Sequence, residues 1–228
     1  MFGLRPPNLL VRRSVRFEDV SPVRPFRWSR GESYFAGWYW AATTGRHVGY
    51  ESWLERDRLM LLDYEPQVVG IASQPFWLHW WDGQRERRHA PDFFARCTDG
   101  SAVVVDVRAD ERIEPRDAEV FDITGQVCAL VGWQFERLGT ADPVLLSNLR
   151  WLSRYRHRRC LNPAIAIRLW EVFATPGPLM AEADAAGDRL ATLPVLFHLL
   201  WTRELTAEDV SAVLLGADTM VRHRGGSQ

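Results

Sequence analysis

Hydrophobic and polar positions between residues 33 and 140 follow patterns typical of both helices and strands. Aromatic and β-branched residues lie on both sides of Thr44-Gly45, which predicts a hairpin that turns at the glycine. In the next stretch, YESWLERDRLMLLDYEP, apolar residues recur at roughly helical spacing until the proline. We therefore expect a helix there, with Glu51 and Glu55 four residues apart on one face.

Strand-like patterns follow this helix. They cover VVGIASQPFWLHWW, RRHAPDFFARC and SAVVVDVRA, and Asp-Gly or similar turn pairs separate them. After Pro115, apolar residues at helical spacing predict an amphipathic helix, and GWQFERLG then reads as a returning strand. The pattern predicts an α/β core in the order helix, antiparallel strands, helix, strand, with a mixed sheet flanked by helices.

The character of the chain changes at both ends of this core. Residues 1–32 are rich in Arg and Pro without a sustained period, which predicts an extended arm on the domain or on a partner. Residues 141–228 have a helical pattern that ends in an apolar hairpin, which predicts a small all-helical, winged-helix domain. A plain helical bundle that serves dimerisation or docking is the alternative for this second domain.

Composition excludes several classes of protein. The 228 residues are 46% hydrophobic, and no apolar run approaches the roughly 18 residues of a membrane span. The N-terminal residues lack the features of a secretion signal, so we expect a cytoplasmic protein without membrane contact. The three cysteines form no CxxC pair, which argues against a disulfide framework or a zinc ribbon. The net charge of −1 means that binding to nucleic acid depends on local patches.

Three acidic residues are candidates for a metal site. Glu55 lies on the predicted helix, Asp92 follows a proline at the start of a strand, and Asp106 follows three valines in an apolar strand. A carboxylate inside such a strand is costly unless a partner such as a metal compensates its charge. Converging carboxylates suit Mg²⁺, and Mn²⁺ can substitute for it.

Each of these residues also has an ordinary structural interpretation. Asp106 could pair with Arg108 on the same strand face, Asp92 could cap a turn, and Glu55 could be a solvated helix residue. His89 could assist at a metal, although a loop histidine bound to backbone is the simpler interpretation. We interpret Glu51 as an alternative to Glu55 or as a supporting residue.

The order of the motifs resembles the TnsA-like endonuclease subunits of heteromeric transposases, members of the PD-(D/E)xK superfamily. The resemblance rests on SWLERDRLMLLDYEPQVVGIASQP, HAPDFFARCTDG, VVVDVR and AEVFDITGQVCALVGWQFERL, within residues 35–138. It implies a restriction-endonuclease-like core followed by a winged-helix domain.

The resemblance also assigns roles to residues of this chain. It implies that Glu55, Asp92 and Asp106 surround Mg²⁺, with the carbonyl of Val107 as a further ligand. Arg108 stands where the superfamily usually has lysine. Arginine stays protonated and cannot act as a base, but it can hold a phosphate. This departure leaves both an active enzyme and a binding-only relative open.

The resemblance implies a DNA endonuclease that hydrolyses one strand at transposon ends, beside a DDE-type transposase subunit and an ATPase regulator. The alternatives are a DNA-binding assembly module with a decayed site, and a stand-alone restriction or defence nuclease. Double-stranded DNA is the expected ligand, and the interpretation also allows a homodimer.

Two groups of arginines are candidates for contacts to DNA. All 28 of the chain's Lys and Arg residues are arginine, and arginine suits bidentate phosphate contacts. One group precedes the PDF motif, and the other ends a predicted helix after residue 141; a solvated loop or helix face is the alternative for each. They comprise Arg85, Arg87, Arg88, Arg150, Arg154, Arg156, Arg158 and Arg159.

Overall fold

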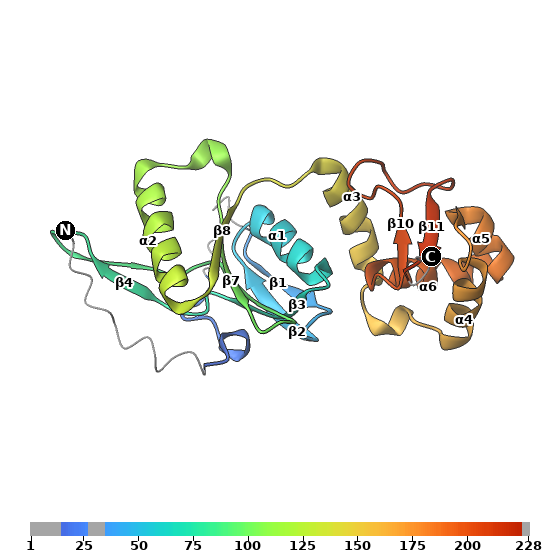
Figure 1. The fold of residues 1–228 in the computed structure, drawn as a ribbon, viewed down its shortest axis with the longest axis horizontal. Helices are drawn as coiled ribbons and strands as arrows, with labels where there is room; N and C mark the ends of the chain where they lie inside the picture. Colours follow the sequence, from blue (N-terminus) through green and yellow to red (C-terminus); the bar gives the residue numbers. More distant parts are fainter. Residues whose placement is uncertain (1–14, 27–34, 225–228) are drawn as a thin grey trace. The chain divides into compact units, whose positions relative to one another are not determined.

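A computed structural model describes residues 15–26 and 35–224. The chain divides into two compact units, Met1–Thr140 and Ala141–Gln228 (Figure 1). The described residues form an α/β protein with a mixed sheet and six α-helices, so the prediction of an α/β class is confirmed. The arm predicted for residues 1–32 lies partly outside the described residues.

A four-stranded mixed sheet forms the centre of the first unit. Its order is β3-β6-β7-β8, and only the pairing of β7 with β8 is parallel. Helix α2 (Pro115–Val131) provides the crossover that a parallel pair requires, after the short 3₁₀ turn Asp110–Arg112. The strands are β3 (Val68–Ser73), β6 (Phe93–Cys97), β7 (Ala102–Val107) and β8 (Gln134–Leu138).

Helix α1 (Trp53–Tyr64) precedes the sheet and packs against β3 and β7. Its N-cap is Ser52, whose side chain accepts a hydrogen bond from the backbone N–H of Glu55. Glu51 therefore lies before the cap, and the prediction that it shares a helix face with Glu55 was wrong. A serine at the cap with glutamate three residues later is the signature of a capping box, which fixes where the helix begins.

Two hairpins complete the first unit. The predicted hairpin around Gly45 is confirmed by β1 (Gly37–Ala41) and β2 (Arg46–Tyr50). The second joins β4 (Leu78–Trp81) to β5 (Glu86–His89). The pattern had merged β3 with β4 and β5 with β6. The first run breaks at Gln74, whose φ of 46° is incompatible with a continuous strand.

The arm contributes to the core of the first unit through one residue. Phe17, in the 3₁₀ turn Phe17–Asp19, is buried in a cluster with Phe94 and Val104. Its ring also meets the indole of Trp133 edge-on, with centroids 5.4 Å apart. The described part of the arm, residues 15–26, therefore lies on the domain, as one of the two predicted alternatives states.

The second unit contains helices and a small sheet, so the prediction of an all-helical domain was wrong. A three-stranded antiparallel sheet has the order β10-β11-β9. Its strands have only two to four residues, too few to show a period of two in the sequence. The strands are β9 (Gly177–Pro178), β10 (Leu205–Ala207) and β11 (Met220–His223).

The helices of the second unit enclose their own core. Helix α6 supplies much of it, with Leu196 and Leu199 fully buried. The helices are α3 (Pro143–Leu152), α4 (Pro163–Val172), α5 (Leu179–Ala186) and α6 (Arg189–Trp201), with 3₁₀ turns at Ser153–Tyr155 and Arg158–Cys160.

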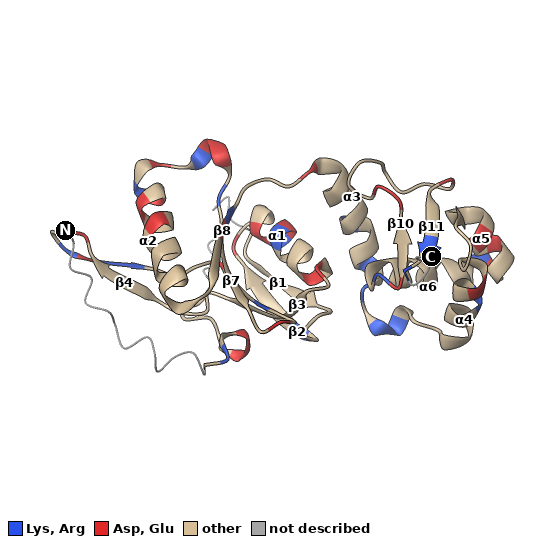
Figure 2. Ribbon diagram, in the orientation of Figure 1, with Lys and Arg blue, Asp and Glu red and all other residues tan. Residues whose placement is uncertain are grey.

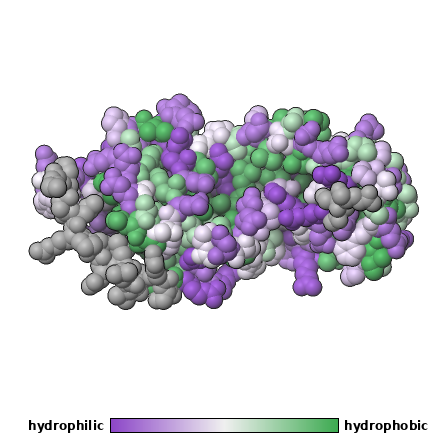
Figure 3. All heavy atoms as spheres, viewed as in Figure 1, coloured by the Kyte–Doolittle hydropathy of each residue, from purple (hydrophilic) through white to green (hydrophobic). Residues whose placement is uncertain are grey.

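The surface mixes hydrophilic and hydrophobic residues on the face drawn in Figure 3. Within the described part of the chain, no helix has the length and apolar character needed to cross a membrane.

Acidic and basic residues lie close together at the start of α2 (Figure 2). The described structure therefore offers local clusters of charge, of which one lines a pocket in the first unit.

Candidate active site

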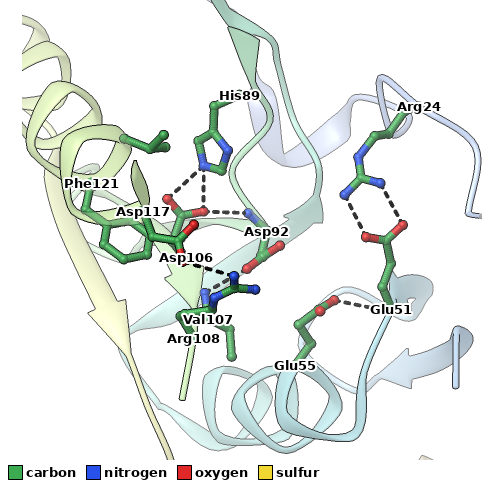
Figure 4. A pocket seen from close by; sticks show the side chains of 11 residues that line it. Arg24, Glu51, Glu55, His89, Asp92, Asp106, Val107, Arg108, Asp117 and Phe121 are labelled. Carbon is green, nitrogen blue, oxygen red and sulfur yellow. Dashed lines mark hydrogen bonds and ion pairs between the residues drawn. The ribbon is translucent and has the colours of Figure 1, made fainter. Parts of the chain in front are cut away.

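Three separate segments bring the predicted acidic residues to one pocket of the first unit. Glu55 comes from the first turn of α1, Asp92 from the residue before β6, and Asp106 from the end of β7. All three line the same hollow of about 270 Å³, together with Val107 and Arg108 (Figure 4). Residues 14 to 51 positions apart in the sequence thus meet where the sheet and α1 adjoin.

Asp106 is the most deeply buried of the three acidic residues, with 2% of its surface exposed. Both of its carboxylate oxygens lie 2.9 Å from Nε2 of His89, and the backbone N–H of Asp92 donates to Oδ1 at 3.3 Å. His89 is the last residue of β5, and its ring binds the Asp106 carboxylate. The interpretation as a loop histidine bound to backbone was therefore wrong. The ordinary pairing of Asp106 with Arg108 is not the one that forms.

Asp92 sits between the other two carboxylates. Its Oδ2 accepts a hydrogen bond of 2.7 Å from the backbone N–H of Val107. Burial raises the pKa of Asp92 well above its usual value, and the negative charges of Glu55 and Asp106 raise it further. A cation at this position would lower the pKa of Asp92 again, because it would compensate the buried negative charge and offset the repulsion from Glu55 and Asp106.

Glu55 has two roles at the start of α1. Its side chain accepts hydrogen bonds from the backbone N–H of Glu51 at 2.6 Å and from the Ser52 hydroxyl at 2.9 Å. It therefore binds the residues at the start of α1 and at the same time lines the pocket. Burial raises the pKa of Glu55, although these two hydrogen bonds act in the opposite direction. The interpretation as a merely solvated helix residue does not fit this partly buried position.

Two arginines flank the acidic residues, and a carboxylate holds each of them. Arg24, from the arm, binds both oxygens of Glu51 at 2.9 and 2.6 Å. Arg108 donates from Nη2 to Asp117 of α2 at 3.0 Å, and its buried Nε has no partner among the described residues. Arg108 therefore retains an N–H group that could donate a hydrogen bond to a phosphate oxygen.

The pocket includes residues that the sequence did not single out as part of the site. Arg24 is far from the acidic motifs in the chain, so no spacing could connect them. Asp117 carried a weak signal, because an acidic residue in the first turn after Pro115 is typical of a helix start. Burial acts to raise the pKa of Asp117, but the backbone N–H of Glu114 and the Arg108 guanidinium lower it overall.

The chemistry of the donor set suits a hard divalent cation. Carboxylate oxygens are the ligands that Mg²⁺ prefers, and burial and neighbouring negative charges raise the pKa values of Glu55 and Asp92. In the described residues, however, no group of three or more His, Cys, Asp or Glu side chains is already arranged to hold a metal ion. A metal in this pocket would meet an Asp106 carboxylate whose two oxygens both lie 2.9 Å from Nε2 of His89.

The predicted DNA-binding arginines lie in two places. Arg85, Arg87 and Arg88 belong to the β4–β5 hairpin of the first unit and line a second pocket. The other five lie in the last turn of α3 and in the segment between α3 and α4 of the second unit; four are exposed and Arg156 is partly buried. They are Arg150, Arg154, Arg156, Arg158 and Arg159.

Searches for related proteins do not identify the chain. No family model matches it, and no curated protein is similar to it.

Proposed function

We propose that this chain is a Mg²⁺-dependent DNA endonuclease with Glu55, Asp92 and Asp106 as its metal ligands. The observation that supports the proposal is the meeting of these three residues, with Val107 and Arg108, in one pocket. Bound Mg²⁺ would orient and acidify a water molecule and balance negative charge on the scissile phosphate. Mn²⁺ is expected to support the same chemistry.

The residues of the chain have separate tasks in this proposal. Asp92 and Asp106 supply oxygens from the sheet, and Glu55 supplies oxygens from α1. Arg108 stays protonated, so it holds a phosphate oxygen rather than removing a proton from water. Asp117 keeps the Arg108 side chain directed into the pocket until DNA is bound.

The fold supports the same proposal. A mixed sheet with a helical crossover between β7 and β8 is compatible with a restriction-endonuclease-like core. The order α4, β9, α5, α6, β10, β11 in the second unit is compatible with a winged helix. We further propose, from the resemblance of the motifs, that the DNA is a transposon end and that a DDE-type transposase and an ATPase regulator act beside this chain.

Calorimetric titration with Mg²⁺ and Mn²⁺ tests the site without knowledge of the DNA sequence. We expect the wild type to bind the metal and the Asp92→Ala and Asp106→Ala variants to lose at least about tenfold in affinity. Asp82→Ala is the matched control, because Asp82 is an aspartate of the same unit outside the pocket. Equal binding by all four proteins would contradict the proposal.

A DNA-binding module without cleavage is the second candidate, and Arg108 favours it. Arginine replaces the expected lysine, and its guanidinium is already bound to Asp117. Cleavage of a plasmid in Mg²⁺ or Mn²⁺ by the wild type, lost in Asp92→Ala, would exclude this candidate. If the wild type binds DNA without cutting and Arg108→Lys gains cleavage, the decayed site is the better explanation.

A further inference from the structure

A second pocket of the first unit, about 390 Å³ in volume, lies beside the acidic one. Asp117 and Val120 of α2 are walls of both pockets, so the two are neighbours across this helix. The remaining walls come from the β4–β5 hairpin and from α2. They are Trp80, Arg85, Arg87, Arg88, Arg116 and Glu119.

The pairing of β4 with β5 places some residues of this pocket on the same face of the hairpin as His89, which contacts the acidic site. Trp80 pairs with Arg87, and Leu78 pairs with His89. Opposite residues of an antiparallel pair share a face, and so do alternate residues of a strand. Trp80, Arg87 and His89 therefore lie on one face, and His89 on that face reaches Asp106.

The pocket has unused hydrogen-bond donors. The Nε1–H of Trp80 is buried without an acceptor in the described parts of the chain. A buried donor without an acceptor is rare and suggests a ligand that supplies one. Arg85 is exposed, and the structure as described shows no side-chain partner for it. Arg116 adds a third donor group from the first turn of α2, although Glu114 accepts from it at 2.9 Å.

Charge favours an anionic ligand. Four arginines line the pocket against two acidic residues, Asp117 and Glu119. Asp117 is bound to Arg108, and Arg87 is bound to Asp82, which is not a wall of the pocket. The N-terminal end of a helix adds partial positive charge. A phosphate group combines the negative charge and the acceptor oxygens that these donors require.

We propose that Trp80, Arg85, Arg87 and Arg116 form a phosphate-binding subsite for the nucleic-acid backbone beside the scissile phosphate. This inference rests on the proposed nuclease function and extends it to the DNA strand that leaves the acidic pocket. The subsite contacts phosphate rather than bases, so it adds affinity without sequence preference.

The first experiment measures the affinity for a labelled DNA duplex without divalent metal, over a series of salt concentrations. The Arg85→Ala/Arg87→Ala variant is expected to bind about tenfold more weakly, with a salt slope lower by about 0.9 for each lost contact. Arg46→Ala is the matched control, because Arg46 is exposed in the same unit and paired with Asp19, as Arg87 is with Asp82. Equal losses in both proteins would overturn the subsite.

The second experiment uses inorganic phosphate as the probe and observes the indole N–H signals by NMR. Trp80→Phe identifies the signal of Trp80 while keeping an aromatic ring in place. We expect this signal to shift with phosphate in the wild type and not in Arg85→Ala/Arg87→Ala. A signal that does not move would overturn the subsite.

The two experiments distinguish the subsite from the nuclease proposal. A Trp80 shift with phosphate, in a protein that binds neither metal nor DNA, would support an anion subsite and contradict the nuclease. Metal and DNA binding that do not respond to the Arg85, Arg87 and Trp80 variants would support the nuclease and overturn the subsite.

Discussion

The first unit buries carboxylates in two different settings. Asp63, at the end of α1, is 6% exposed and accepts hydrogen bonds from the Tyr39 hydroxyl and from the backbone N–H groups of Ala42 and Thr43. These three neutral donors join α1 to β1 and to the turn that follows it. Asp63 is therefore a structural residue, and its donors compensate its burial.

Asp92 is in the opposite position. It accepts a hydrogen bond from Val107, but burial raises its pKa, and the negative charges of Glu55, Asp106 and Glu51 raise it further. Burial alone therefore does not mark a functional carboxylate. A functional carboxylate is indicated instead by several carboxylates close together with too little positive charge to balance them. Such an arrangement is stable only if a cation or a proton compensates the negative charge.

The largest expected effect separates the two settings by stability. Asp63→Ala removes the acceptor of three hydrogen bonds, which we expect to lower the free energy of unfolding by about 3 kcal/mol. Asp92→Asn removes a repelled charge, and in metal-free buffer it should leave stability unchanged or raise it by on the order of 1 kcal/mol. Urea unfolding in the presence of a chelator measures both. A similar loss in the two variants would remove the distinction.

Much of the first unit could be predicted from the sequence. The long periodic segments indicated α1 and α2, and the valines before Asp106 indicated the buried strand β7. The three acidic residues could also be assigned, because each lies at the start or end of a recognisable element. Glu55, Asp92 and Asp106 are the three acidic residues that the sequence pattern indicates, and all three line one pocket.

Other features depend on contacts that have no local signal. The pairing of Arg24 with Glu51 joins residues 27 positions apart, and that of His89 with Asp106 depends on how a hairpin folds back. The start of α1 was placed too early because helical spacing continues across Ser52, whose capping role depends on its side-chain hydrogen bond. The strands of the second unit are too short for periodicity to reveal.

A smaller effect tests what His89 does for Asp106. If His89 holds the carboxylate in position for a metal, His89→Ala should weaken Mg²⁺ or Mn²⁺ binding by about tenfold. His79→Ala is the control, since His79 lies in the same hairpin, is exposed, and pairs with Glu86. Calorimetric titration of both variants with Mg²⁺ or Mn²⁺ measures the change in metal affinity. Tighter metal binding by His89→Ala would show instead that the histidine competes with the metal.

The smallest effect is a dependence of stability on pH. The folded-state pKa of Asp92 is raised above its ordinary value of 3.8, so the folded protein keeps a proton that the unfolded chain has lost. Metal-free stability should therefore fall as the pH rises above 3.8 through the raised pKa. Thermal unfolding over this range should show a weaker dependence in Asp92→Asn, and the stabilisation by Mg²⁺ in the wild type should grow with pH.

Asp82 provides a control of opposite sign for this measurement. Hydrogen bonds from the backbone of Arg85 and Gln84 and from Arg87 lower the pKa of this carboxyl to about 2. Its stabilising contribution is therefore present above 3.8 and is lost as the pH falls toward about 2. Asp82→Asn should remove this pH dependence at the acidic end of the stability curve and lower the stability above 3.8 by a constant amount, with the same slope there as in the wild type. If Asp92→Asn changes only that same acidic end, its carboxyl is stabilised by hydrogen bonds like that of Asp82, and the acidic pocket loses its main argument for a cation.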